Sequence, residues 1–312
     1  MSLFLNNTLS AATQVGVLYA IVAVGFICDK TGLFSEATAR KVVKLLLNLI
    51  VPCAIINSFM DIEMNDDTVK KFFISLGLGA ATHVIAIIIN AFTFRNKSDE
   101  DNPVYKYAAI YGNLGFMALP LAEAVLGAEG VFYCANGYVM FNVFTYIHGI
   151  ALMRKTKEKM NLRQLILNPG VISFLIGLPV FLLDIKLPYV FSEPLDMLAA
   201  LNSPMGMLIF GTYLAKTDIK SMFTDKKIYL VGLLKLIVLP VICFGLYYLC
   251  GVKGVLLTAA IISASVPSAN NTFMFATMYD RNTAIASKTV ALVSFMSILT
   301  IPVMIALTQL TW

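Results

Sequence analysis

The feature that most constrains this chain is a series of long apolar segments joined by short loops. A helix needs about 20 predominantly apolar residues to cross the hydrocarbon core of a bilayer. Ten segments reach that length, at residues 9–28, 41–60, 70–94, 105–126, 129–152, 167–185, 195–215, 228–250, 254–279 and 284–310. The chain is 59% hydrophobic and only 13% charged, with a mean hydropathy of +0.81, whereas soluble domains are about 25% charged. The sequence therefore predicts an all-α polytopic membrane protein of ten transmembrane helices in a lipid bilayer.

The positions of the basic residues predict the orientation of these helices. Of the 23 Lys and Arg residues, 18 lie in alternate loops on one side, four lie in the opposite loops, and Lys235 lies inside segment eight. Because cytoplasmic loops are enriched in Lys and Arg, we expect both termini outside and the basic loop 153–166 in the cytoplasm. We also expect the membrane to be a bacterial inner (plasma) membrane. The basic residues form no patch, so nucleic acid is not an expected partner.

The chain divides into two halves of five segments each, 1–152 and 167–312, joined by the loop 153–166. An odd number of crossings per half forces the halves into opposite orientations. Pro120 in segment four and Pro267 in segment nine also fall at corresponding positions. Inverted repeats with interrupted helices at matched positions are typical of secondary transporters, so we expect a five-plus-five inverted repeat.

Segments four and nine carry helix-breaking residues where a simple membrane anchor has none. A proline has no N–H and its ring clashes with the carbonyl one turn back, and glycine tolerates non-helical backbone. We therefore expect Pro120 and Pro267 to make the two breaks, and Gly112 and Gly115 to permit the first. Freed backbone groups that face lipid cost several kcal/mol each, which favours two breaks that face each other across a polar cavity. The alternative is that both prolines only kink continuous helices.

Polar side chains cluster beside both prolines and predict an anion site. The N-termini of half-helices carry partial positive charge, and neutral amides and hydroxyls donate hydrogen bonds without a fixed charge. We expect a small organic anion, and the side chains expected to bind it are Tyr111, Asn113, Ser265, Ser268, Asn270 and Asn271. No cofactor and no metal site is expected.

Four titratable residues inside the segments leave the coupling ion open. Glu123 is a candidate ligand for Na⁺ or H⁺, or else it lies at the outer interface. His83 and His148 are candidates for proton coupling, although a lone histidine more often bonds a neighbouring helix. Lys235 is expected to snorkel to the cytoplasmic interface, with balance of the substrate's charge as the alternative.

Other functional classes fit the sequence less well. An intramembrane aspartyl protease needs two mid-span Asp residues, and a serine enzyme needs a Ser–His pair; neither pattern is present. A channel is disfavoured because matched breaks in an inverted repeat suit alternating access rather than an open pore. The sequence thus predicts a transporter rather than an enzyme.

Two stretches carry a resemblance to a known family. "GNLGFMALPLAEAVLG" (112–127) and "PSANNTFMFATMYDRNTAIASKTVALVSFMSILTIPVMIAL" (267–307) resemble signatures of the auxin efflux carrier family. The resemblance implies a fold similar to that of bile-acid sodium symporters, with broken helices four and nine crossing at the substrate. It implies a scaffold of helices 1, 2, 6 and 7, a mobile core of helices 3–5 and 8–10 that moves like an elevator, and a homodimer through the scaffold. The substrates it implies are auxin-like monocarboxylates or dicarboxylates such as malate.

Overall fold

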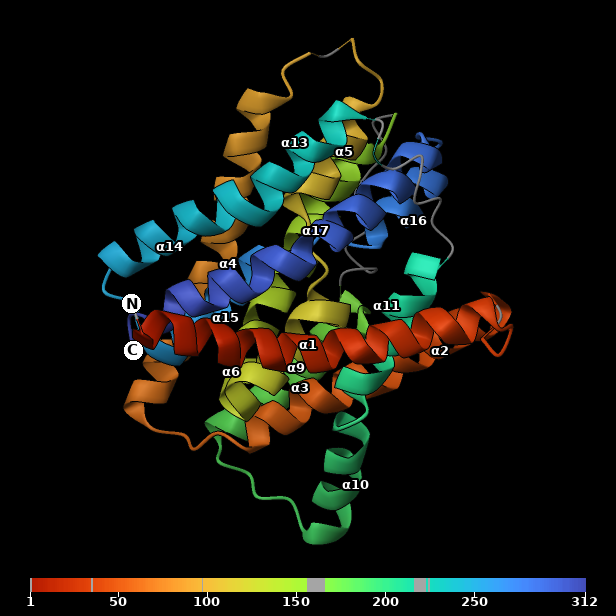
Figure 1. The fold of residues 1–312 in the computed structure, drawn as a ribbon. Coiled ribbons are helices and arrows are strands. Elements are labelled where there is room, and N and C mark those ends of the chain that lie inside the picture. The colour runs from red at the N-terminus through yellow and green to blue at the C-terminus, as the bar shows by residue number, and fades with distance from the viewer. Residues whose placement is uncertain (1, 35, 97, 156–165, 216–222, 224) are drawn as a thin grey trace.

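The computed structural model describes the whole chain except residues 1, 35, 97, 156–165, 216–222 and 224. The described residues form helices and connecting turns, with no strand beyond a single isolated bridge (Figure 1). This confirms the predicted all-helical class. The predicted basic loop 153–166 lies largely outside the described residues, so the orientation of the chain stays a prediction.

The helices follow one another in the order of the predicted segments. In the first half they are α1 (Ser2–Lys30), α2 (Glu36–Leu45), α3 (Val51–Met60), α4 (Asp66–Thr93), α5 (Asn102–Ile110), α6 (Leu119–Phe144) and α7 (Ile150–Met153). In the second half they are α9 (Pro169–Leu182), α10 (Tyr189–Ala199), α11 (Asn202–Ala215), α13 (Lys226–Leu233), α14 (Leu239–Leu249), α15 (Gly254–Ser265), α16 (Asn271–Met278) and α17 (Thr283–Gln309). Four π-helical turns interrupt them: η1 (Leu46–Ile50), η2 (Leu114–Ala118), η3 (Thr145–Gly149) and η4 (Leu234–Val238).

Several of these helices are long and apolar enough to cross a membrane. Within the described residues there are five, at Lys41–Met60, Asp66–Thr93, Leu114–Met153, Lys226–Leu249 and Thr283–Gln309. Pro169–Leu182 and Gly254–Ser265 are apolar but shorter. The chain is thus an integral membrane protein, and the full set of ten crossings stays a prediction. Leu114–Met153 covers two predicted segments. A kink at Gly127 separates them, where φ is +67°, a conformation that glycine adopts readily.

Three of the π turns have a shared cause in the sequence. Pro52, Pro120 and Pro240 each follow such a turn at the same spacing. A proline removes one helical N–H and pushes away the carbonyl four residues back. The residue before each proline therefore donates to the carbonyl five residues back instead, as Leu119 does to Leu114 and Leu239 to Leu234. These prolines widen their helices by one residue and leave them unbroken.

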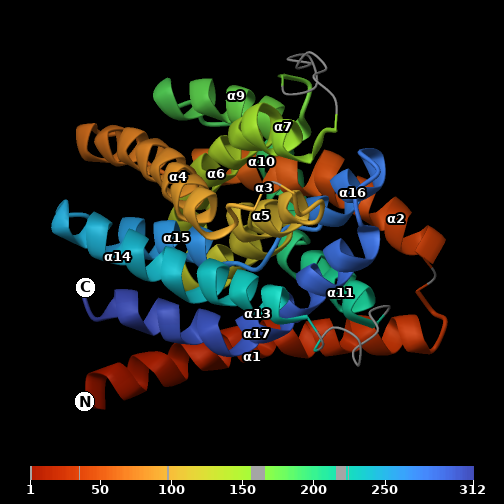
Figure 2. The same ribbon diagram turned by 90° about the horizontal axis from the view of Figure 1, so that it is seen from above.

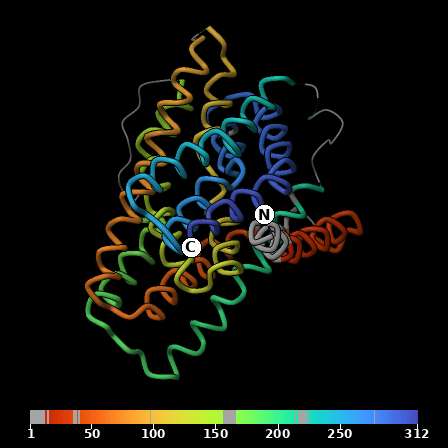
Figure 3. Tube along the Cα trace, turned by 60° about the vertical axis from the view of Figure 1, so that its left-hand side comes forward, coloured from red at the N-terminus to blue at the C-terminus, as the bar shows by residue number. Residues whose placement is uncertain are grey.

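The helices pack as a layered bundle. Helix α17 lies between α1 and the α13–α14 helix in both views (Figures 1 and 2). Helix α4 packs on α6 and α14, and α6 packs on α15. Helix α10 extends away from the body of the molecule in Figures 1 and 3 and touches α3, where Asn57 Nδ2 donates to Asp196 Oδ1 at 2.8 Å.

Helices α1 and α11 form the closest helix–helix contact. A Cβ on Gly25 would lie 2.1 Å from the Leu208 carbonyl oxygen, and a Cβ on Gly211 would lie 2.0 Å from the Val22 carbonyl oxygen. Small residues that allow two backbones to touch drive helix association in membranes, where lipid removes the hydrophobic driving force. The pairing of α1 with α11 therefore depends on the absence of a side chain at both glycines.

We predict that Gly25→Ala destabilises the protein by about 1–3 kcal/mol, the usual cost of overpacking. Gly16→Ala on the same helix is the matched control, because a Cβ there meets nothing within 4 Å. Alanine is favoured over glycine in a helix by about 1 kcal/mol, so the control should be neutral or stabilising. Thermal unfolding in detergent measures both. Equal melting temperatures for the two variants would contradict the close α1–α11 approach.

Two side-chain pairs join the α4–α5 loop and helix α5 to the start of α13. Lys227 Nζ binds Asp99 Oδ2, and the Tyr105 hydroxyl donates to Asp225 Oδ2. Asp225 also caps α13, because its Oδ1 accepts from the Lys227 backbone N–H at 2.8 Å. The Lys227 ammonium beside Asp99 lowers the pKa of that carboxyl. These contacts fix the spacing of α5 and α13 at one end of the bundle.

The Asp99 pair predicts a pH dependence of stability. Because the pKa of Asp99 is lower in the folded than in the unfolded chain, its contribution is fully present above the unfolded pKa, about 3.9, and is lost as pH falls through the folded pKa. Asp99→Asn should therefore lower the melting temperature slightly at pH 7, and the difference from wild type should shrink steadily as the pH falls below about 3.9. Glu100→Gln is the control, because the Glu100 side chain has no partner among the described residues. A difference that persists in acid would contradict the assignment.

Candidate functional site

The two interrupted helices meet at their interruptions. Helix α5 ends at Ile110 and helical structure resumes at Leu114, while α15 ends at Ser265 and α16 begins at Asn271. The Asn113 N–H donates to the Pro267 carbonyl at 2.8 Å, and the Ala269 N–H donates to the Tyr111 carbonyl at 2.9 Å. Gly112 and Ser268 form an antiparallel bridge between these two bonds. We call the paired segments 111–113 and 266–270 the crossing.

The ends of the helices at the crossing are capped from the opposite segment. The last carbonyls of a helix have no partner within the helix, and the Ala108 carbonyl of α5 accepts from the Ser268 hydroxyl at 2.7 Å. The Asn113 carbonyl accepts from the N–H of Met117 at 3.1 Å, at the start of the next helix. At the crossing, these backbone groups thus form hydrogen bonds within the protein that lipid could not provide.

Gly112 is required at the crossing by close approach. A Cβ there would lie 2.9 Å from Val266 Cγ2 and 3.0 Å from Lys235 Nζ. Gly115, the second glycine expected to permit the break, lies inside the π turn η2, where a Cβ would lie 3.3 Å from the Tyr138 ring. Only Gly112 of the two is therefore part of the crossing itself.

Pro267 and Pro120 differ in their position relative to the helix interruptions. Pro267 lies within the second interruption, and its carbonyl accepts from Asn113. Pro120 lies in the first turn of α6, after η2, so the first interruption comes before it, between Ile110 and Leu114. The physical reason is that the π turn η2 accommodates the missing N–H of Pro120. Backbone pairing with the second segment holds residues 111–113 out of the helical conformation. The sequence expectation that Pro120 makes the break is corrected accordingly.

A cavity of about 160 Å³ opens on one side of the crossing; we call it the crossing cavity. Its walls include Asn113, Asn270 and Asn271 from the two interrupted helices. The Nδ2 atoms of Asn113 and Asn270 are buried and have no partner among the described residues. Neither Asn113 nor Asn270 caps the following helix with its side chain. The cavity therefore holds two unused amide donors at the start of two helices.

Three side chains predicted to bind substrate do not line this cavity. Ser268 caps α5, as described above. The Tyr111 hydroxyl donates to the Phe144 carbonyl at 2.9 Å and lies 2.9 Å from His148 Nδ1. The Ser265 hydroxyl is buried without a partner among the described residues. Tyr111 and Ser268 are thus engaged in holding the crossing in place.

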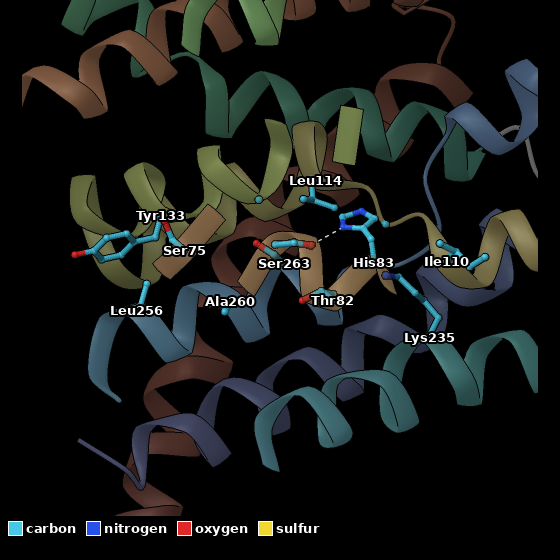
Figure 4. A pocket seen from close by; sticks show the side chains of 13 residues that line it. Ser75, Thr82, His83, Ile110, Leu114, Tyr133, Lys235, Leu256, Ala260 and Ser263 are labelled. Carbon is cyan, nitrogen blue, oxygen red and sulfur yellow. Dashed lines mark hydrogen bonds between the residues drawn. The ribbon is translucent and has the colours of Figure 1, made fainter. Parts of the chain in front are cut away.

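A second, smaller cavity lies on the other side of the crossing; we call it the inner cavity (Figure 4). Its volume of about 20 Å³ has room for about one water. Its polar walls are Ser75, Thr82 and His83 of α4, Tyr133 of α6, Ser263 of α15 and Lys235 of η4. Gly112 and Leu114 line both cavities, so the two cavities are neighbours on either side of these two residues.

Lys235 does not snorkel to an interface. Its side chain is 1% exposed and reaches inward, so that its Nζ lies beside Gly112 (Figure 4). The reason is local: side chains of α4 and α15 provide polar walls around the Lys235 side chain inside the bundle. The expectation of snorkelling is therefore wrong.

The other titratable candidates are distributed as follows. His83 lines the inner cavity, and its Nδ1 donates to the Gly79 carbonyl at 2.7 Å. His148 contacts the Tyr111 hydroxyl. Glu123 lies apart from both cavities, near Asp196, and its Oε2 is buried without a partner among the described residues.

Some walls of the crossing cavity could not be found from the sequence. They come from the end of α6 and from η3, and they are Tyr138, Phe141, Asn142, Thr145 and Tyr146. No break, glycine cluster or charge marks this stretch. For Lys235 a signal did exist, because an ionisable residue inside an apolar span marks a functional site by default.

These features define a helical integral membrane protein in which two interrupted helices cross and enclose polar cavities. The chain belongs to the family described as "Membrane transport protein", which it matches over residues 10–305. This confirms the resemblance to the auxin efflux carrier family.

Three relatives extend over most of the chain. An "Uncharacterized transporter" of Methanocaldococcus jannaschii is 23% identical over 301 residues, 91% of this chain and 94% of the relative. Another of Methanothermobacter thermautotrophicus is 23% identical and covers 94% and 96%. A "Putative malonate transporter" of Rhizobium meliloti is 25% identical over 248 residues, 76% and 77%. The chain is thus a membrane transporter by family.

We predict that Ser268→Ala destabilises the protein by about 1–3 kcal/mol, because it leaves the buried Ala108 carbonyl without its donor. Ser265→Ala is the matched control at the same crossing. Its hydroxyl has no partner to lose, so this change should be neutral or stabilising. Thermal unfolding without ligand measures both variants. If the control is as damaging as Ser268→Ala, the capping role is refuted.

Proposed function

We propose that this protein is a secondary transporter of small organic anions and that a carboxylate binds in the crossing cavity. The observation that carries the proposal is the pair of unused amide donors, Asn113 Nδ2 and Asn270 Nδ2, in one cavity. A buried donor without a partner costs about 1–3 kcal/mol. A carboxylate has two acceptor oxygens, so it can accept a hydrogen bond from each amide at once.

The cavity's size and surroundings favour a small anion. A volume of about 160 Å³ exceeds the space one water needs, roughly 10–15 Å³, many times over. The helix starts at Leu114 and Asn271 bring partial positive charge to the wall. A dicarboxylate of three or four carbons suits these dimensions, in keeping with the malonate in one relative's name. An auxin-like monocarboxylate is the second substrate in this class.

The proposal includes movement of one helix group against another. Helix α1 packs on α11, and α3 packs on α9 and α10; these helices would form the scaffold. The interrupted helices, with α4, α13, α14 and α17, would form the mobile core. Where α11 faces the core, Gly206 comes close to the Phe116 carbonyl of η2. A small residue at such a contact allows two surfaces to slide, which supports an elevator-like motion of the crossing.

A second candidate is coupling of the same transport to Na⁺ or H⁺ through Glu123. The observation that favours it is the buried Glu123 Oε2 without a partner among the described residues. Glu123→Gln keeps the size of the side chain and removes its charge and its exchangeable proton. Transport that is unchanged in this variant across a series of pH values and sodium concentrations would exclude the coupling role.

We predict that carboxylates raise the melting temperature of the purified protein and that both Asn113→Ala and Asn270→Ala abolish the effect. A ligand at 100 times its dissociation constant adds about 2.7 kcal/mol, which a thermal shift assay detects easily. Malonate, malate and indole-3-acetate are the probes. Asn48→Ala is the control, because Asn48 is exposed and its amide bonds the Lys44 carbonyl.

The outcomes of this assay are distinct. Loss of the shift in both cavity variants and its retention in Asn48→Ala support the site. A shift that survives in both cavity variants moves the binding site elsewhere. If none of the three carboxylates shifts wild type, the proposed substrate class is wrong.

A further inference from the structure

Lys235 is a buried positive charge at the centre of the molecule. It lies in η4, within the apolar helix Lys226–Leu249, and its side chain is 1% exposed. Its Nζ points into the inner cavity beside Gly112 (Figure 4). An isolated ion costs several kcal/mol to bury unless it is paired, so a compensating negative charge would stabilise the Lys235 ammonium at this position.

The described part of the chain supplies no such charge. No ion pair or hydrogen bond joins Lys235 Nζ to another described residue, and no carboxylate lines the inner cavity. The other ionisable side chains that line the inner cavity are His83 of α4 and Tyr133 of α6. His83 already donates through Nδ1 to the Gly79 carbonyl, which leaves Nε2 as a neutral acceptor. His83 can accept a hydrogen bond, directly or through one water, but it cannot neutralise an ammonium.

A negative charge that compensates Lys235 has room in the crossing cavity. Gly112 lines both cavities, and the Lys235 ammonium lies so close to it that a Cβ on Gly112 would be 3.0 Å from Nζ. The crossing cavity contains the two amide donors that have no acceptor among the described residues. Gly112 and Leu114 lie between this cavity and the Lys235 ammonium. In a low-dielectric interior, two opposite charges attract strongly even when they do not touch.

We propose that Lys235 is the fixed counter-charge of the anion that binds in the crossing cavity, and that it acts through the backbone at Gly112. This inference rests on the proposed function and adds the residue that selects anions over neutral molecules. Lys235 is a positioning residue: Asn113 and Asn270 touch the carboxylate, and the ammonium behind them makes a negative charge favourable there. The same ammonium repels a free cation from the inner cavity, so Na⁺ does not supply the positive charge there.

The test compares malonate with malonamide, its uncharged analogue of the same shape. Binding of each is measured by calorimetric titration of the purified full-length protein in detergent, with wild type, Lys235→Met and Lys253→Met. Methionine keeps most of the length of the lysine and removes the charge. Lys253→Met is the control, because Lys253 is exposed at the start of α15 and removes an equal charge far from the crossing.

We expect Lys235→Met to weaken malonate binding at least tenfold and to leave malonamide binding unchanged. A residue needed only for packing would affect both ligands equally. Lys253→Met should bind malonate as wild type does. Retention of malonate affinity in Lys235→Met overturns the inference and leaves the proposed function standing, whereas absence of malonate binding to wild type removes malonate as a ligand of the proposed site.

A second measurement needs no variant at Lys235 and keeps the inference falsifiable if Lys235→Met does not fold. Malonate binding to wild type is titrated in sodium and in choline buffers of equal ionic strength. Equal affinities, together with at least tenfold weaker binding of malonamide, support a built-in positive charge. A requirement for Na⁺ that persists in Glu123→Gln, or equal binding of malonate and malonamide, overturns it.

Discussion

The structure depends on the backbone pairing between two interrupted helices. An unpaired N–H or carbonyl in the membrane interior costs several kcal/mol, so neither interruption could exist alone. The Asn113–Pro267 and Ala269–Tyr111 hydrogen bonds let each satisfy the other. Ser268 then caps α5 from the opposite segment. The pairing also fixes where the cavities lie, because the paired segments form the wall between them.

The sequence was sufficient to predict which segments are interrupted, but not where or how. Proline and glycine content marks segments four and nine correctly. Pro120, however, produces a π turn in an unbroken helix, as Pro52 and Pro240 do. The actual interruption at residues 111–113 is set by a partner more than 150 residues away in the chain. Local propensity carries no information about such a partner, so the position of the first break could not be read from residues 107 to 127.

The influence of a distant partner segment also explains why only some of the side chains predicted to bind substrate line the crossing cavity. Asn113, Asn270 and Asn271 do line the crossing cavity, whereas Tyr111, Ser265 and Ser268 do not. In a regular helix the 3.6-residue period would separate the two groups, but extended segments that pair with each other have no such period. Lys235 was misjudged for a different reason. Distance along the helix to the interface favoured snorkelling, while the polar inner cavity that the side chain lines is visible only in the fold.

The proposed site combines two neutral donors, the Asn113 and Asn270 amides, with one buried charge, the Lys235 ammonium, and this combination would affect transport. A carrier must bind its substrate well enough to select it and weakly enough to release it on the other side. An ammonium in direct contact with a carboxylate inside a dry site would hold it too tightly, since their attraction grows as distance and dielectric constant fall. Under the proposed function, an ammonium set behind the crossing would attract the anion from a greater distance, while the Asn113 and Asn270 amides would supply directional contacts that break more easily. Selection by charge and release of substrate would then depend on different residues.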